Sequence, residues 1–215
     1  MAAAVEKAYQ AIREGIVRGD YAPGSHLTAQ DLAAANGLSR TPVREAMRRL
    51  HSEGLISFIP HRGAFVTQME ERDIEKIYDL RTVLESFAAE AAAAEATDAQ
   101  IAELDRLAQT MVGAVEARKD VDEIARLNNS FHKLIIAAAA NPRLEVALAS
   151  TVEAPLVLRT FLQYSLEELR RSAAQHVELV AAIRARDPAW AKSVMVSHIL
   201  AGRNALLRRM ATEPA

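Results

Sequence analysis

Apolar residues return every three to four positions along most of this chain, the spacing that places them on one side of a helix. In the N-terminal part, the capping residues Thr28 and Ser39 and several glycines divide this pattern into three helices, and two runs of strand-forming residues follow. The expected elements are, in chain order, a helix over 2–17, a short helix between Thr28 and Gly37, a helix from Arg40 to Gly54, and strands at 55–59 and 64–67 joined by a turn at 60–63.

Beyond Thr67 the pattern is helical, with almost no strand signal. A charged stretch at 70–73 follows the second strand, and we place a boundary there between domains 1–69 and 70–215. Capping residues and prolines mark the breaks between helices, and Ser165 with Glu168 forms a capping-box pattern. The helices expected in the second domain are 71–96, 98–118, 121–140, 143–151, 155–164, 166–186 and 188–210. The fold class is therefore mainly α, ending in an all-helical bundle.

Charge and composition narrow the class of protein. The net charge of the 215 residues is −2, but residues 1–66 hold eight Lys/Arg and six Asp/Glu, whereas residues 67–215 hold 18 and 22. There is no cysteine, so neither disulfides nor thiolate metal sites can form. No secretory signal begins the chain, and the apolar run 134–140 is too short to cross a membrane. These features favour a cytoplasmic protein with no membrane partner.

The third helix carries a cluster of cations. Arg40 and Arg44 are four residues apart and share one face, with Thr41 beside them at the helix N-terminus. Recognition helices present such residues to base edges in the major groove, where arginine suits guanine. Arg48 and Arg49 suit backbone phosphates. The alternative interpretation is that this is an ordinary solvent-exposed helix rich in arginine, with no role in DNA binding.

The predicted turn between the strands is also basic. His61 and Arg62 precede Gly63, so this tip suits the minor groove or a phosphate. The order of helix, turn, basic helix and hairpin is that of a winged helix-turn-helix, which favours double-stranded DNA as a partner.

Three of the six histidines lie in the second domain, at His132, His176 and His198. Helical wheels place each on or beside an apolar face, and Asn128 stands one turn before His132. A lone histidine on such a face is usually a core residue with one hydrogen bond. Three of them, on separate helices, also suit a divalent metal such as zinc or nickel. Spacing alone leaves both interpretations open.

Arg81 falls on an apolar helical stripe with Ile77 and Leu84. A cation that faces inward is costly unless it is paired. It is either one half of a salt bridge, for example with Glu85, or a clamp for the carboxylate of a small ligand.

Residues 5–67 resemble the DNA-binding domain of the GntR family of bacterial transcription regulators. The resemblance implies that Arg40, Thr41 and Arg44 contact bases and that His61 and Gly63 belong to the wing. Relatives often carry arginine where this chain has Gln30, which removes one expected DNA contact. The resemblance rests on 12–16, 19–27, 31–33, 38–50, 53–55 and 62–63.

Residues 73–210 resemble the FCD ligand domain of the FadR subfamily of that family, on the landmarks 81–85, 128–132 and His176 to His198. The resemblance implies a divalent metal held by Asn128, His132, His176 and His198, and a small organic acid bound by Arg81. Many relatives have aspartate at the position of Asn128, and a neutral amide is a poorer ligand than a carboxylate.

We therefore expect a dimeric transcription regulator, a repressor, that binds a palindromic operator and responds to a small carboxylate. The homodimer is implied by the family rather than by particular residues. One alternative is a metal-dependent enzyme, but the chain shows no nucleophile motif or general base paired with the histidines. The other alternative is a structural, nucleoid-type DNA-binding protein, which would need a more basic surface. We expect no enzymatic activity.

Overall fold

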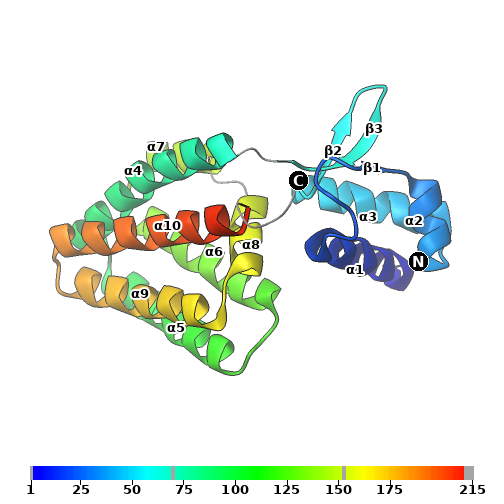
Figure 1. Cartoon of the computed structure of the whole chain (residues 1–215). Helices are drawn as coiled ribbons and strands as arrows, with labels where there is room; N and C mark the ends of the chain where they lie inside the picture. Colours follow the sequence, from blue (N-terminus) through cyan, green and yellow to red (C-terminus); the bar gives the residue numbers. More distant parts are fainter. Residues whose placement is uncertain (1, 69–70, 152–153, 211–215) are drawn as a thin grey trace. The chain divides into compact units, whose positions relative to one another are not determined.

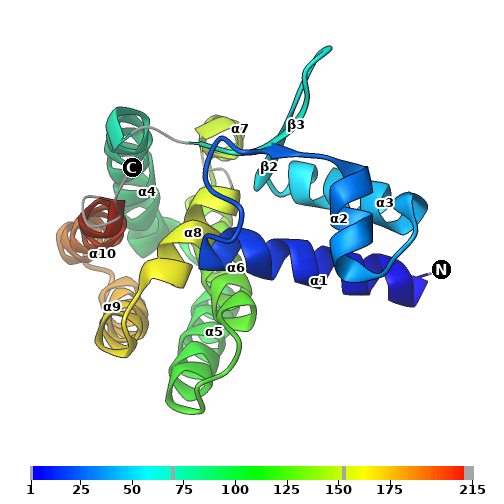
Figure 2. The ribbon, with the colours of Figure 1, turned by 45° about the vertical axis from the view of Figure 1, so that its right-hand side comes forward.

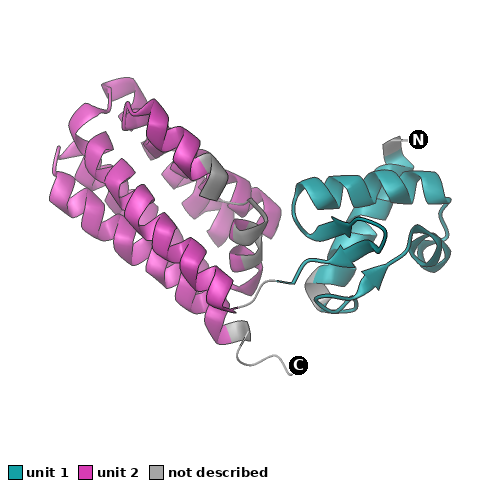
Figure 3. Cartoon of the chain, turned by 90° about the horizontal axis from the view of Figure 1, so that it is seen from above, with its two compact units in different colours: residues 1–69 teal, residues 70–215 magenta. Residues whose placement is uncertain are grey.

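The chain forms two compact units, residues 1–69 and 70–215, each with its own core (Figure 3). The computed structural model describes residues 2–68, 71–151 and 154–210. Within these ranges helices dominate both units, and strands occur in the first (Figure 1). The prediction of a mainly α protein is confirmed. No helix among the described residues is both long and apolar enough to cross a membrane.

Unit 1 is a three-helix cluster with a three-stranded antiparallel sheet. The strand order is β1-β3-β2, with Phe58 opposite Ala64 in the hairpin and Leu27 opposite Ala64 on the other side. The first strand was not predicted, because two residues are too few to show an alternating pattern. The elements are α1 (Ala2–Arg18), β1 (His26–Leu27), α2 (Ala29–Asn36), α3 (Arg40–Ser52), β2 (Ile56–Ile59) and β3 (Gly63–Val66).

The core of unit 1 fixes the orientation of α3. Val43, Met47 and Leu50 form the buried side of this helix and pack with Ile12 of α1 and Leu55 before β2. Their spacing of three and four residues leaves the opposite side of α3 in solvent. The core therefore determines which side chains of α3 are exposed.

Different capping interactions set the helix boundaries of unit 1. Thr28 accepts a hydrogen bond from the backbone N–H of Asp31, as the sequence predicts, and Gly37 ends α2 with a φ of 62°. Ser39 has the extended backbone of an N-cap, but its side chain makes no capping hydrogen bond. Ser39 is thus the N-cap of α3, as predicted, but it lacks the hydrogen bond that such a side chain usually makes.

Unit 2 is an all-helical bundle. Helix α4 runs beside α10, α5 beside α9 and α6, and α6 also contacts α4 and α8 (Figures 1 and 2). Most predicted breaks fall within two residues of the observed ends. The helices are α4 (Glu71–Glu95), α5 (Asp98–Glu116), α6 (Val121–Ala138), α7 (Pro142–Thr151), α8 (Ala154–Gln163), α9 (Leu166–Arg184) and α10 (Pro188–Met210).

Local contacts set several of these boundaries and hold neighbouring helices together. Ser165 and Glu168 form the predicted capping box at the start of α9. The sole tryptophan, Trp190 in the first turn of α10, donates its indole N–H to Glu178 of α9 at 3.1 Å. These contacts bring α9 and α10, which carry His176 and His198, into a defined pair.

Candidate functional site

The exposed side of α3 presents three of the predicted DNA-contacting residues. Arg40, Thr41 and Arg44 are all exposed. Among the described residues, neither Arg40 nor Arg44 makes a side-chain hydrogen bond or an ion pair. Both guanidiniums are therefore available to an external partner.

The next two arginines have different surroundings. Arg48 pairs only with Glu45 on the same helix, at 2.9 Å, and both side chains are exposed. Arg49 lies over the ring of Tyr9 in α1, 3.6 Å from the ring centroid, and pairs with Glu6 at 2.8 Å and with Glu53 at 3.2 Å. Arg49 thus connects α1 to the end of α3, a role that the sequence analysis did not anticipate.

The tip of the hairpin has a constrained backbone. His61 has a φ of 60°, and Gly63 has a φ of 98°, a conformation that side chains other than glycine rarely adopt. A Cβ on Gly63 would also lie 2.6 Å from Nε2 of His26 in β1. His26 was not among the predicted residues, because its role depends on the unpredicted strand. Gly63 therefore determines the path of the wing, while His61 and Arg62 are exposed beside it.

A cleft of about 440 Å³ lies between α3 and the hairpin. Its walls include Arg44 and Arg48 from α3, Phe58 and Gly63 from the hairpin, and His26 from β1. The helix and the wing thus border one hollow in unit 1, and two arginines of α3 lie on its wall.

The three histidines of unit 2 meet in its interior. His132 comes from α6, His176 from α9 and His198 from α10, and all three are buried. One ring nitrogen from each lies within 4.8 Å of the others, and the two Nε2 atoms of His132 and His198 are 3.1 Å apart. Two nitrogens bound to one ion at about 2.1 Å would be separated by roughly 3.0–3.4 Å. The arrangement could hold a metal ion.

Two side chains at this cluster have buried polar atoms without a partner. Both ring nitrogens of His176 and Oδ1 of Asn128 make no hydrogen bond in the described part of the chain. The His176 ring stacks on Phe131, with the ring centroids 4.2 Å apart, which fixes its orientation. Unpaired polar atoms in a core are costly. A metal that accepts lone pairs from both residues would remove this cost, so the donor set fits the predicted ion.

A second layer of contacts orients the histidines. Glu85 receives a hydrogen bond from Nδ1 of His132 at 2.5 Å and one from Nε of Arg81 at 2.7 Å. Nδ1 of His198 lies 3.3 Å from Oε1 of Gln175. Partners of this kind fix the ring and the tautomer of metal-binding histidines. The salt bridge of Arg81 with Glu85, one of the two alternatives that the sequence leaves open, is present. The contacts of Glu85 and Gln175 to histidines come from other helices and have no signal in the sequence.

Burial and neighbouring charges set the ionisation of this cluster. Burial lowers the pKa of both His176 and His198 well below the usual value, and neighbouring histidines add to the effect. Burial opposes ionisation of Glu85, but Arg81 and His132 hold the pKa of its carboxyl well below the usual range. The cluster therefore combines the neutral imidazoles of His176 and His198 with one buried carboxylate, and a neutral imidazole is the form that binds a metal.

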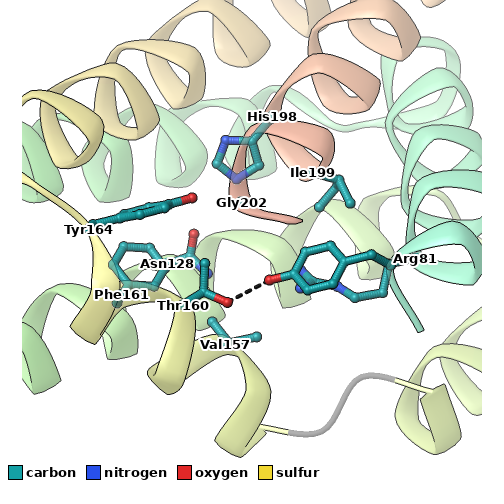
Figure 4. Close-up of a pocket in the computed structure, with 10 residues that line it drawn as sticks. Arg81, Asn128, Val157, Thr160, Phe161, Tyr164, His198, Ile199 and Gly202 are labelled. Carbon is teal, nitrogen blue, oxygen red and sulfur yellow. Dashed lines mark hydrogen bonds between the residues drawn. The ribbon is translucent and has the colours of Figure 1, made fainter. Parts of the chain in front are cut away.

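A small pocket adjoins the histidines (Figure 4). Its water-accessible space is about 20 Å³, enough for about one water molecule. Helices α4, α6, α8 and α10 all contribute to it. Its polar lining consists of Tyr78, Arg81, Asn128, Thr160, Tyr164 and His198. Arg81 and Asn128 thus line one pocket, together with three hydroxyl groups that have no signal in the sequence.

Comparison with known families accounts for both units. The family described as "Bacterial regulatory proteins, gntR family" matches residues 4–66, and the FCD domain matches residues 76–201, more than half of the chain. The chain belongs to the GntR family and carries an FCD domain. As a GntR-family protein it is a transcription regulator and not an enzyme, in agreement with the sequence analysis.

Individual relatives extend the comparison over both units. The HTH-type transcriptional regulator YdhC of Bacillus subtilis is 31% identical over 64% of this chain and 61% of its own length. The HTH-type transcriptional repressor RspR of Escherichia coli is 26% identical over 90% of this chain and 85% of its own. The solved structure of E. coli McbR/YncC covers 98% of this chain and 100% of its own, with 25% identity and a TM-score of 0.66.

Proposed function

We propose that this GntR-family protein is a ligand-responsive repressor of the FadR subfamily. It binds a palindromic operator as a homodimer, in the cytoplasm, and a small organic acid bound near a divalent metal in unit 2 alters its affinity for DNA. The proposal rests on two features of the same chain. One is a basic helix with exposed, unpaired arginines, and the other is a buried histidine cluster with polar atoms that have no hydrogen-bond partner. The relative RspR is named a repressor, which supports the same direction of control.

In the DNA complex, α3 enters the major groove with its N-terminal residues against the base edges. Arg40 and Arg44 donate to bases, and Thr41 adds a hydroxyl contact. Arg48, Arg62 and His61 contact phosphates or the neighbouring minor groove from α3 and the wing, and Gly63 gives the wing its path. Arg49 has three partners inside unit 1. We therefore propose that Arg49 braces α1 against α3, in place of the phosphate contact predicted from the sequence.

In unit 2, Asn128, His132, His176 and His198 hold the metal. Zinc or nickel suits a set of three imidazoles and one amide oxygen. When bound, the ion supplies a Lewis-acidic anchor for a ligand carboxylate. Glu85 and Gln175 hold the His132 and His198 rings in orientation.

The acid occupies the pocket beside this cluster, with Arg81 as its cationic partner. The Nε atom of Arg81 is used by Glu85, so the clamp employs the terminal nitrogens of the guanidinium. A space of about 20 Å³ is smaller than an organic acid, so binding must widen the pocket. This displacement is how ligand binding changes the structure, and acid and operator then alter each other's affinity by the same factor.

The DNA-binding part of the proposal is tested by Arg44→Ala in a footprinting or gel-shift titration. We expect loss of operator-specific binding, with about 1–3 kcal/mol of discrimination removed, while the circular dichroism spectrum is unchanged. Arg106→Ala is the control, because Arg106 is another exposed helical arginine; it pairs with Glu103 and lies in unit 2. Operator protection by Arg44→Ala equal to that of the wild type would remove Arg44 from the base-contacting set.

The effector part is tested by titrating small acids into the protein–operator complex, with zinc or nickel and again with chelator. We expect an acid to change operator affinity in the presence of metal and to lose most of that effect with chelator. A response that is identical with and without metal would contradict the proposed metal site.

A further inference from the structure

The pocket beside the histidines has a wall of hydroxyl groups. Tyr78 of α4 and Thr160 of α8 share a hydrogen bond of 2.5 Å, and Tyr164 lies just beyond the end of α8 (Figure 4). Figure 4 also shows the Tyr164 hydroxyl pointing toward the part of α10 that carries His198 and Gly202. Three hydroxyls on one wall are more than a site for a simple carboxylate requires.

The Tyr164 hydroxyl is a donor without a partner. No hydrogen bond of this group occurs among the residues that the structure describes, although its ring packs against Phe161. Burial raises the pKa of the Tyr164 phenol above its usual range, so the proton stays on the oxygen. A donor in such surroundings gains free energy from any ligand acceptor that reaches it.

A glycine keeps the space beside these hydroxyls open. A Cβ on Gly202 of α10 would lie 3.1 Å from the Tyr164 hydroxyl oxygen, and 3.6 Å from carbon atoms of both Thr160 and Tyr78. Glycine inside a helix costs about 1 kcal/mol relative to alanine. The free space that Gly202 provides thus lies against the hydroxyl wall and comes at a cost in helix stability.

We propose that this wall makes the pocket selective for a small acid that carries an alcohol group, over the same acid with a methylene or a ketone in its place. An alcohol both donates and accepts, so it can accept from Tyr164 and donate to a lone pair of the Tyr78–Thr160 pair. A ketone can only accept, and a methylene does neither. The inference rests on the proposed acid-responsive function and names the class of acid.

The test compares lactate, pyruvate and propionate, which differ at one carbon, by calorimetric titration of the full chain with zinc present. We expect lactate to bind at least about tenfold more tightly than either analogue, because a site built for a hydroxyl discriminates strongly against its absence. Tyr164→Phe removes one oxygen and should bring the three affinities together, whereas Gly202→Ala should weaken all three. Malate and succinate form a second matched pair.

Equal binding of lactate and propionate, with malate equal to succinate, would overturn the selectivity but leave the acid-responsive function intact. Retained discrimination in Tyr164→Phe would overturn the role of this wall. If none of the five acids binds, both the selectivity and the proposed response to small acids fail. Unfolding temperatures of the variants show that each retains its fold.

A separate observation concerns the exposed face of α4. Leu80, Val83 and Phe87 lie within about 60° of one another around the helix and are 54%, 66% and 48% exposed. Val146 of α7, a helix that packs on α4, is 72% exposed. Clustered exposed apolar side chains of this kind mark an interaction surface. We call Leu80, Val83 and Phe87 the α4 face.

The charges beside the α4 face are arranged symmetrically about its centre. Lys76 lies seven residues before Val83 and Glu90 seven residues after it, both within about 20° of the same line along the helix. Two α4 helices that cross antiparallel at Val83 would therefore pair each Lys76 with Glu90 of the second copy and place Leu80 opposite Phe87. This self-complementarity is what a two-fold interface requires.

We infer that the α4 face is the contact between two copies of this chain. In the single chain, Lys76 pairs with Asp73 at 3.4 Å and Glu90 with Lys192 at 2.7 Å. These pairs are exposed and contribute little, so they can exchange for contacts across the axis. The inference deepens the proposed homodimer by naming its surface.

Sedimentation velocity on the full chain tests the contact. We expect the wild type to be a dimer and Val83→Arg a monomer, because residue 83 meets its own copy at the axis. Lys76→Glu and Glu90→Lys should each raise the dissociation constant at least about tenfold, and the double variant should restore it. Lys192→Ala is the matched control, because it removes the internal partner of Glu90 and should leave the dimer intact.

A dimeric Val83→Arg with wild-type affinity would overturn the assignment of this surface while leaving dimerisation itself in place. A double variant as weak as the single ones would overturn the antiparallel register. A monomeric wild type at micromolar concentration would overturn the homodimer together with its surface.

Discussion

Arg48 and Arg49 are neighbours in sequence, yet their side chains have different surroundings. Arg48 has one exposed partner on its own helix, whereas Arg49 has a ring and two carboxylates around it, one of them from α1. Side-chain type and helical position suggest a phosphate contact for both. The distinction depends on residues of α1 that are 40 or more positions away in the chain, so it could not be predicted from the local sequence.

We expect Arg49→Leu to lower the free energy of unfolding of unit 1 by about 1–2 kcal/mol, because it removes the cation–π contact and two ion pairs. Arg48→Leu should leave stability within about 0.5 kcal/mol but reduce the slope of log affinity against log salt by about one. Urea titrations and salt-dependent gel shifts measure the two effects. An unchanged stability of Arg49→Leu would contradict the bracing role.

Asn128 is the one proposed metal ligand that is not a histidine. Its Oδ1 atom is buried and unpaired beside the histidines. We expect Asn128→Asp to raise zinc affinity, roughly tenfold, because an anionic oxygen is a stronger ligand than an amide. Competition with a chelating dye measures the change. Asn129→Asp is the control one residue away, and an equal gain there would indicate general electrostatics instead of ligation.

At the scale of elements, the sequence predicts helices well where capping residues and periodicity agree. The capping box at Ser165 and the Thr28 cap are both present, and α4 to α10 follow in the expected order. The two-residue strand β1 was missed because it forms only by pairing with β3. The histidines were found by their shared apolar environment, whereas the wall of Tyr78, Thr160 and Tyr164 was not, because its members are up to 86 positions apart.

Two serines predicted as helix caps provide a test at this scale. The Ser165 side chain accepts from the backbone of Glu168, while the Ser39 side chain makes no capping bond. Ser165→Ala should therefore cost about 1 kcal/mol of stability, and Ser39→Ala only a few tenths. Chemical denaturation of the two variants gives the comparison. Equal losses would mean that the Ser39 hydroxyl does cap α3 in solution.

At the scale of the whole molecule, the histidine cluster connects three helices of unit 2. His132, His176 and His198 come from α6, α9 and α10, so an ion held by all three opposes their separation. Zinc should therefore raise the free energy of unfolding of unit 2 by about 2.7 kcal/mol at a free zinc concentration a hundred times the dissociation constant. The unfolding temperature should rise accordingly. Chelator should remove this gain. His176→Ala should show none of it, and a full zinc-dependent gain in that variant would contradict the ligand set.

The Trp190 contact described above makes the protein its own optical probe. Trp190 is the only indole in the chain, it begins the helix that carries His198, and its N–H is bonded to Glu178, two residues beyond His176. Excitation near the red edge of protein absorbance therefore reports on one place, the junction of α9 and α10. If zinc draws these helices together, the emission of Trp190 should shift as the ion binds, without any attached dye. The same signal would record how quickly the ion enters and leaves.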